Sequence, residues 1–254
     1  MSVGEDRDAE ARRAELERRL AAVRERIAQA CAAAGRDPDR VELMAVTKTV
    51  PAADVAVLLD LGLTLFGENR AQEAGAKVAE VAALRPDARP RWHFIGGLQR
   101  NKARTVVGWA ARVESVDSVR LADALDRAAA HALDEGRRSG PLPVLLQYSV
   151  DGDAARGGVP ADGLIALADH VAGCGALRLE GLMAVAPLGG DAGADPEAAF
   201  ADIERAADRL RSAHPEASVL SAGMSGDLEV AIRHASGVVR VGTALVGYRP
   251  LASL

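Results

Sequence analysis

The stretch V-E-L-M-A-V-T-K-T-V, residues 41–50, is a short apolar run that ends in a lysine. Glu42 is the single polar residue among its first six, and Thr47 and Lys48 follow. A short apolar run of this kind is typical of a buried β-strand. Lys48 is then either an ordinary charge at a strand end or a reactive amine at the mouth of a site. The choice depends on what surrounds the stretch in the fold.

Further apolar runs follow, separated by alanine-rich amphipathic stretches of helical length. The eight runs are residues 41–46, 63–66, 92–95, 112–116, 143–150, 178–185, 217–221 and 238–241, and the helical stretches include 69–84, 118–134, 160–173 and 196–213. Strands that alternate with helices form right-handed βαβ units and a parallel sheet. Eight such units predict an α/β fold, a (β/α)8 TIM barrel. An open doubly wound sheet is the alternative, but no G-x-G-x-x-G motif opens the first helix.

Residues 1–36, which precede the first run, predict an extra N-terminal helix. One apolar stripe recurs there at spacings of three and four: Leu16, Leu20, Val23, Ile27 and Cys31. We expect this helix to end near Gly35 and to pack on the barrel. No break in composition divides the chain, so residues 1–254 are expected to form a single barrel domain.

The composition excludes several classes of protein. Hydrophobic residues make up 49% and charged residues 26%, and the net charge of −5 argues against nucleic acid as the main partner. The charged N-terminus has no apolar h-region, and no apolar run approaches the roughly 18–20 residues that cross a membrane. Cys31 and Cys174 lie far apart and suggest neither a disulfide framework nor a metal site. We therefore expect a cytoplasmic protein that binds no metal.

Lysine is rare in this chain and occurs only at positions 48, 77 and 102, among 31 lysine and arginine residues. Nucleotide bias is the ordinary explanation for such a preference for arginine. The two side chains differ in chemistry, however, because arginine stays protonated whereas lysine can become a neutral nucleophile. A lysine at the end of an apolar strand therefore invites a chemical explanation.

The chemistry of a TIM barrel lies at the carboxyl ends of its strands, and phosphate groups commonly bind the loops after strands 7 and 8. The seventh run is followed by S-A-G-M-S-G-D-L-E-V-A-I, residues 221–232. Gly223 and Gly226 flank Met224 and Ser225 there, and Ser225 is expected to cap a helix whose first amides bind an anion. An ordinary capping turn is the alternative for this loop.

The eighth run leads into R-V-G-T-A-L-V-G, residues 240–247. Gly242 would let the backbone approach a ligand closely, and Thr243 adds a hydroxyl group. This loop, too, is an ordinary turn when considered alone. Together, the loops after the seventh and eighth runs predict a phosphate site on the face where Lys48 ends the first run.

A phosphate pocket opposite an amine fits a phosphorylated carbonyl compound held as a Schiff base on Lys48. Burial would lower the pKa of the amine and help it to react. The candidate ligands are pyridoxal phosphate and the sugar phosphate of an aldolase. Arg240 would share the orientation of Gly242, and facing a pyridine nitrogen it would keep that nitrogen unprotonated. A surface or ion-paired arginine is the alternative.

Six motifs resemble those of a known family, in the family's order, over almost the whole chain from residue 41. They are A-V-T-K-T (45–49), F-G-E-N-R-A-Q-E (66–73), W-H-F-I-G-G-L-Q-R-N-K (92–102), L-E-G-L-M-A-V (179–185), L-S-A-G-M-S-G-D-L-E-V-A-I (220–232) and V-R-V-G-T-A-L-V-G (239–247). The sequence resembles the pyridoxal-phosphate homeostasis proteins (YggS/PROSC type). These share the fold-type III PLP barrel with the N-terminal domain of alanine racemase.

The resemblance implies a set of residues that bind pyridoxal 5′-phosphate (PLP). They are Lys48, Asn69, His93, Ile95, Met224, Ser225, Gly226, Arg240, Gly242 and Thr243. Lys48 would form the Schiff base, Asn69 would lie near the cofactor ring, and Arg240 would face the pyridine nitrogen. The residues of the last two loops would bind the phosphate. His93 and Ile95 would line the pocket, although His93 could equally be a satisfied core histidine.

The chain departs from the family pattern at positions away from these contacts. Gln147-Tyr148-Ser149 stands where Q-V-N is usual, Val246 replaces a common phenylalanine, and Arg156 replaces a usual lysine. We expect these differences to alter the rim of the pocket and any ligand preference, and to leave cofactor binding intact.

The resemblance implies a PLP-binding homeostasis protein, with apo-PLP enzymes as partners and no catalytic turnover. A racemase or another fold-type III enzyme acting on a small amino acid is the alternative, and the motifs disfavour an aldolase. The chain ends at Leu254, so we expect no second racemase domain with its opposing tyrosine, and hence a monomer. Neither Tyr148 nor Tyr248 has a spacing that marks it as the missing base.

Overall fold

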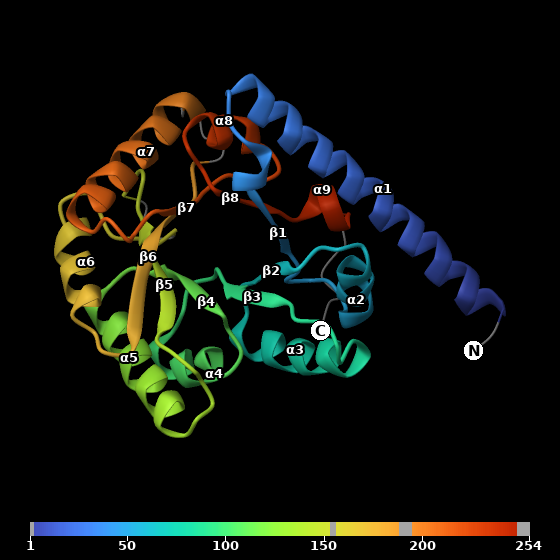
Figure 1. The fold of residues 1–254 in the computed structure, drawn as a ribbon, viewed down its shortest axis with the longest axis horizontal. Coiled ribbons are helices and arrows are strands. Elements are labelled where there is room, and N and C mark those ends of the chain that lie inside the picture. Colours follow the sequence, from blue (N-terminus) through green and yellow to red (C-terminus); the bar gives the residue numbers. More distant parts are fainter. Residues whose placement is uncertain (1–2, 153–155, 188–194, 248–254) are drawn as a thin grey trace.

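The computed structural model describes residues 3–152, 156–187 and 195–247, and its strands close into one parallel barrel in chain order (Figure 1). The strands are β1 (Glu42–Val46), β2 (Leu65–Glu68), β3 (Arg91–Phe94), β4 (Arg112–Val116), β5 (Leu142–Tyr148), β6 (Leu177–Ala184), β7 (Val219–Ser221) and β8 (Val238–Val241). Met44 of β1 pairs with Arg240 of β8, which closes the ring. The barrel predicted from the alternation of runs is confirmed, and the open doubly wound sheet is excluded.

The helices surround the barrel. They are α2 (Ala52–Asp60), α3 (Ala71–Leu84), α4 (Ala103–Val107), α5 (Val119–Asp134), α6 (Leu164–Ala172), α7 (Pro196–Ala213), α8 (Leu228–Arg233) and α9 (Thr243–Val246), with the 3-10 turns η1 (Pro38–Arg40) and η2 (Arg100–Lys102). The stretches named from the sequence correspond to α3, α5, α6 and α7. Helices α4 and α9 are too short to show a helical period, so the sequence pattern does not reveal them.

Helix α1 (Val3–Ala33) is the extra N-terminal helix, and it packs across α2, α8 and α9 (Figure 1). All five residues of the predicted apolar stripe are buried. The helix ends before Gly35, whose positive φ of 64° favours glycine. No helix in the described part of the chain is both long enough and apolar enough to span a membrane.

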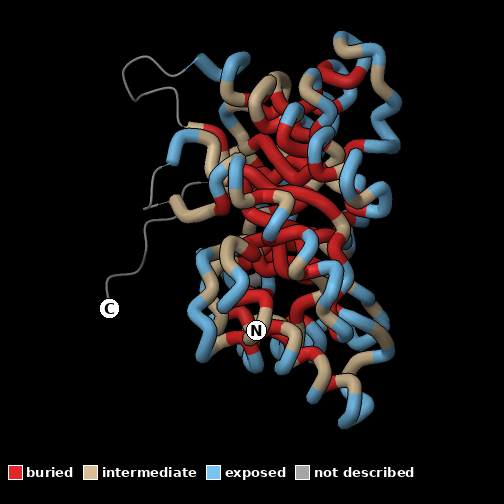
Figure 2. Tube along the Cα trace, turned by 90° about the vertical axis from the view of Figure 1, so that its left-hand side faces the viewer, coloured by how far each residue is buried: buried red, intermediate tan, exposed pale blue. Residues whose placement is uncertain are grey.

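The apolar core lies mainly between the barrel and its helices, so that buried segments run through the middle of the molecule and exposed ones surround them (Figure 2). On β8, Val239 and Val241 pack outward with the α1 stripe, whereas Val238 contacts Met44 inside the barrel. This alternation turns Arg240 inward as well. The barrel interior is partly polar, because Arg240, His93 and Glu114 are buried there.

A bulge in β6 changes which of its residues face inward. The register with β5 shifts between Val144 and Leu145, and Gly181 sits at the shift with a φ of 153°. Glu180, which has no pairing partner on β5, lies at the shift and contacts Arg112 of β4, whereas Met183 and Val185 follow it and line the cavity described next.

Candidate functional site

A cavity of about 630 Å³ opens at the carboxyl ends of the strands. Nine of the ten residues predicted from the sequence line it: Lys48, Asn69, Ile95, Met224, Ser225, Gly226, Arg240, Gly242 and Thr243. Val246, which the sequence analysis expects at the rim of the pocket, lines it as well, whereas six further lining residues were not identified from the sequence: Val46, Thr49, Gly96, Met183, Val185 and Gly247. Alternation along β1 could have revealed Val46, two residues before Lys48, whereas the β6 bulge hides Met183 and Val185.

Lys48 lies in the turn that follows β1 and is exposed at the cavity. The burial that the sequence analysis considers for this amine is therefore not found in the structure. The preceding Thr47 is fully buried, and its hydroxyl donates to Glu68 Oε1 of β2 over 2.7 Å. The backbone of the lysine turn is thus fixed while its amine remains accessible to a ligand.

A second lysine supports the same turn. Lys77 of α3 donates from Nζ to Thr47 O over 2.5 Å and to Glu68 Oε1 over 2.7 Å. The Lys77 side chain is 12% exposed and that of Glu68 is 1% exposed, so the ion pair is largely desolvated. Because its charge is paired with Glu68, Lys77 serves the fold and not as a free amine.

Lys77→Met is expected to lower the free energy of unfolding by about 3 kcal/mol, because the Glu68 carboxylate would stay buried without its cation. Lys102→Met is the matched control, since Lys102 ends η2 and forms no ion pair within the described residues. Urea unfolding of both variants measures the difference. Equal unfolding free energies would contradict a supporting role for Lys77.

Asn69 follows β2, and its Oδ1 is buried without a hydrogen-bond partner in the described structure. The backbone of Asn69 packs directly against Gly96, and a Cβ atom at Gly96 would lie only 2.4 Å from Asn69 O. A buried amide oxygen without a partner is costly unless a ligand supplies a donor. Asn69 Oδ1 is therefore positioned to accept a hydrogen bond from a ligand in the cavity.

The loop after β7 differs from the prediction in its cap. Ser225 does not cap α8; the N-cap residue is Asp227, whose Oδ1 accepts from the Met224 amide. Burial raises the pKa of Asp227, against the opposing effects of the Met224 amide and Arg240. The amides of Ser225 and Gly226 donate to no backbone carbonyl within the described chain, so they are available to an anion.

At two glycines of the cavity the described residues leave room for a side chain. A Cβ atom at Gly226 would meet nothing within 4 Å, and one at Gly242 would reach Val46 at an ordinary 3.6 Å. Packing against the described residues therefore does not require glycine at either position. Thr243, the first residue of α9, is exposed beside Gly242.

Helix α1 supports both the loop after β7 and the segment after β8. Arg26 donates to Ser225 O over 3.2 Å and pairs with Glu229 over 2.7 Å. Arg12 donates to Val246 O over 2.9 Å and pairs with Asp54 over 2.7 Å. The extra N-terminal helix thus supports the part of the cavity where the anion site is predicted.

Arg240 is 4% exposed and reaches the cavity from inside the barrel. Its Nη1 donates to Ser221 O over 2.8 Å and to Ser221 Oγ over 2.9 Å, and its Nη2 donates to Ala184 O over 2.7 Å. Burial lowers the pKa of Arg240, while Glu114 and Asp227 oppose that effect. The alternative of a surface arginine is therefore wrong.

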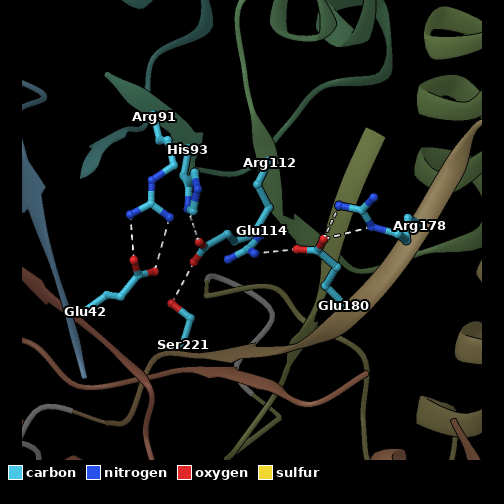
Figure 3. A network of polar contacts seen from close by, with 8 residues as sticks. All are labelled: Glu42, Arg91, His93, Arg112, Glu114, Arg178, Glu180 and Ser221. Atoms are coloured by element: carbon cyan, nitrogen blue, oxygen red, sulfur yellow. Dashed lines mark hydrogen bonds and ion pairs between the residues drawn. The ribbon is translucent and has the colours of Figure 1, made fainter. Parts of the chain in front are cut away.

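His93 does not line the cavity, which corrects the role implied by the resemblance. It is 2% exposed, and its Nδ1 lies 2.6 Å from Glu114 Oε1 on the neighbouring strand β4 (Figure 3). His93 and Ile95 are two residues apart and share one face of the strand. Ile95 reaches the cavity, and the register of β2, β3 and β4 places His93 below it. His93 is thus the core histidine of the alternative interpretation.

Tyr148 is remote from the cavity chemistry. Its hydroxyl donates to Asp202 Oδ2 over 2.7 Å, and burial together with this hydrogen bond raises the pKa of Tyr148 to about 12. Tyr248 lies outside the described residues. Among the described residues that line the cavity, Lys48 and Arg240 carry the ionisable side chains.

Comparisons with known proteins agree with this geometry. The family model of the alanine racemase N-terminal domain matches residues 19–250. A pyridoxal phosphate homeostasis protein of Mycobacterium leprae is 46% identical over 250 residues, covering 95% of this chain and 96% of that protein. The Escherichia coli K12 protein of the same name is 35% identical over 237 residues, covering 91% and 95%. The structure of PipY from Synechococcus elongatus with PLP bound gives a TM-score of 0.76 at 35% identity, covering 92% of this chain and 100% of that chain.

Proposed function

Because the chain belongs to the pyridoxal phosphate homeostasis protein family, we propose that it binds PLP in the cavity at the carboxyl ends of the strands and holds it for vitamin B6 homeostasis. The observation that carries this proposal is the convergence of three features on one cavity. They are an exposed lysine, a buried arginine and two glycine-containing loops, the first of which has the Ser225 and Gly226 amides that donate to no backbone carbonyl among the described residues.

The residues present fit this cofactor on two structural grounds. The Asn69 Oδ1 atom is buried without a hydrogen-bond partner among the described residues, and the cavity offers space at Gly226 and Gly242 that side chains at these positions would fill. An unpaired buried acceptor and an open backbone cradle are both expected where a polar, phosphorylated ligand binds.

When bound, PLP supplies an aldehyde that condenses with a primary amine and releases water. Lys48 would supply that amine, and its exposure lets it react without a change in the fold. The Ser225 and Gly226 amides, with the Thr243 hydroxyl, would bind the phosphate. Arg240 is a donor only, so it would favour an unprotonated ring nitrogen.

The same arrangement supports holding the cofactor rather than racemising an amino acid. Stereochemical inversion needs a second acid/base group opposite the lysine, and Tyr148 is engaged with Asp202 outside the cavity. Multiple turnover in a racemisation or transamination assay over a panel of amino acids would overturn the holding role. Transfer to apo-PLP enzymes, a monomeric state and a cytoplasmic location stay predictions.

Gly226→Val is expected to weaken PLP binding at least about tenfold, because its side chain would enter the space left for the phosphate. Gly97→Val is the matched control, since Gly97 also has open space around its Cβ position but does not line the cavity. Titration with PLP and with pyridoxal, which lacks the phosphate, measures the effect. A Gly226→Val protein that keeps the full preference for the phosphorylated form would contradict this placement of the phosphate.

A further inference from the structure

The barrel interior below the cavity contains a chain of polar side chains drawn from four strands. His93 of β3 contacts Glu114 of β4 over 2.6 Å, and Glu114 Oε2 accepts from the Ser221 hydroxyl of β7 over 2.7 Å (Figure 3). The same hydroxyl accepts from Arg240 Nη1 of β8 over 2.9 Å. A continuous hydrogen-bonded path therefore runs from His93 to the arginine at the cavity.

The donor and acceptor chemistry of these side chains allows each hydrogen bond in the path to be donated in one direction only. A guanidinium can only donate, and an ionised carboxylate can only accept. The Ser221 hydroxyl must therefore accept from Arg240 and donate to Glu114, and His93 Nδ1 must donate to the other carboxylate oxygen. Each hydrogen position is determined by its neighbours, so the path holds the Arg240 guanidinium in one orientation.

The charges in the path also compensate one another. Burial alone would raise the pKa of Glu114, but His93, Arg240 and Ser221 outweigh it and hold that pKa below its ordinary value. Glu114 is therefore ionised and provides a buried counter-charge to Arg240. The other charged side chains drawn in Figure 3 belong to separate and more exposed sets: Glu42 pairs with Arg91, and Glu180 pairs with Arg112 and Arg178.

We propose that Glu114, acting through the Ser221 hydroxyl and oriented by His93, is the positioning residue that holds Arg240 toward the cavity and thereby makes the site selective for a ligand with a ring-nitrogen acceptor. This inference rests on the proposed function. Arg240 is fixed before the ligand arrives, because its remaining bonds go to the backbone oxygens of Ser221 and Ala184. A ligand without an acceptor would leave the fixed guanidinium with an unpaired donor, which lowers affinity.

The test compares the affinity for PLP with that for its 1-deaza isostere, in which a carbon replaces the ring nitrogen. The wild-type protein is expected to prefer PLP by about tenfold. Ser221→Ala and Glu114→Gln are expected to lower that ratio, because only the backbone bonds of Arg240 remain, while Ser221→Thr, which retains the hydroxyl, is expected to keep it. Inorganic phosphate is expected to compete with PLP equally well in all variants, because the loops after β7 and β8 that would bind the phosphate are unchanged.

Two matched controls separate positioning from general damage to the barrel. Ser115→Ala removes a buried hydroxyl that has no hydrogen-bond partner among the described residues, and Glu42→Gln removes a half-exposed carboxylate that pairs with Arg91. Both are expected to keep the wild-type ratio. If the Glu114→Gln protein does not fold, the PLP preference of the Ser221→Ala protein alone tests the positioning role.

Each outcome bears on a separate claim. A wild-type protein that binds neither ligand overturns the proposed function. A wild-type protein that binds both equally, or a Ser221→Ala protein that keeps the full preference, overturns the positioning role while leaving PLP binding in place.

Discussion

Replacing Lys48 with alanine is expected to abolish the visible absorption band of the complex with PLP, because the amine that would bond the aldehyde is gone. Lys48 is the lysine that lines the cavity, and its amine is exposed there. Noncovalent binding of PLP should persist at reduced affinity, since Arg240 and the loops after β7 and β8 remain. Absorption spectra and equilibrium dialysis of the same samples separate these two effects.

The chain provides its own controls for this experiment, because it contains only two other lysines. Lys102→Ala is expected to keep the band unchanged, since Lys102 does not line the cavity. Lys77 cannot readily replace the missing amine, because its Nζ is paired with Glu68 and the Thr47 carbonyl. A Lys48→Ala protein that retains the band would show that the covalent bond, if any, forms elsewhere.

Gly181→Ala is expected to destabilise the fold by about 3 kcal/mol or more. A Cβ atom at this position would lie 1.9 Å from Val219 O, and a φ of 153° is unfavourable for any residue with a side chain. The clash is with the backbone of β7, so neither strand can relieve it without breaking the β6–β7 pairing. Urea unfolding monitored by circular dichroism measures the loss.

Gly175→Ala is the control for Gly181→Ala, because Gly175 lies just before β6 and has open space where its Cβ would be. Its unfolding free energy should remain within about 0.5 kcal/mol of the wild-type value. A similar small change for Gly181→Ala would mean that the bulge is tolerant. The role assigned to it in turning Met183 and Val185 toward the cavity would then be wrong.

Local sequence patterns determined the architecture of this protein. Short apolar runs that alternate with amphipathic stretches are set by residues near one another in the chain, and the eight runs correspond to the eight strands. Strand ends are also local features, so the rule that chemistry lies at the carboxyl ends of barrel strands was enough to bring Lys48, Gly242 and Thr243 together. The family motifs added Asn69 and Ile95, which lie on the same cavity.

Only the tertiary structure decided the features that depend on contacts between distant segments. Asp227, not Ser225, is the N-cap residue of α8, and its carboxylate accepts from the Met224 amide ahead of the helix rather than from an amide within it. Met183 and Val185 face the cavity because a bulge shifts the register of β6 against β5. His93 lies below the cavity, and Arg240 reaches it from the interior, because the register of four strands unites His93, Glu114, Ser221 and Arg240. Each partner in that chain is remote in sequence from the next, so no local pattern records it, and barrel closure alone makes the contact.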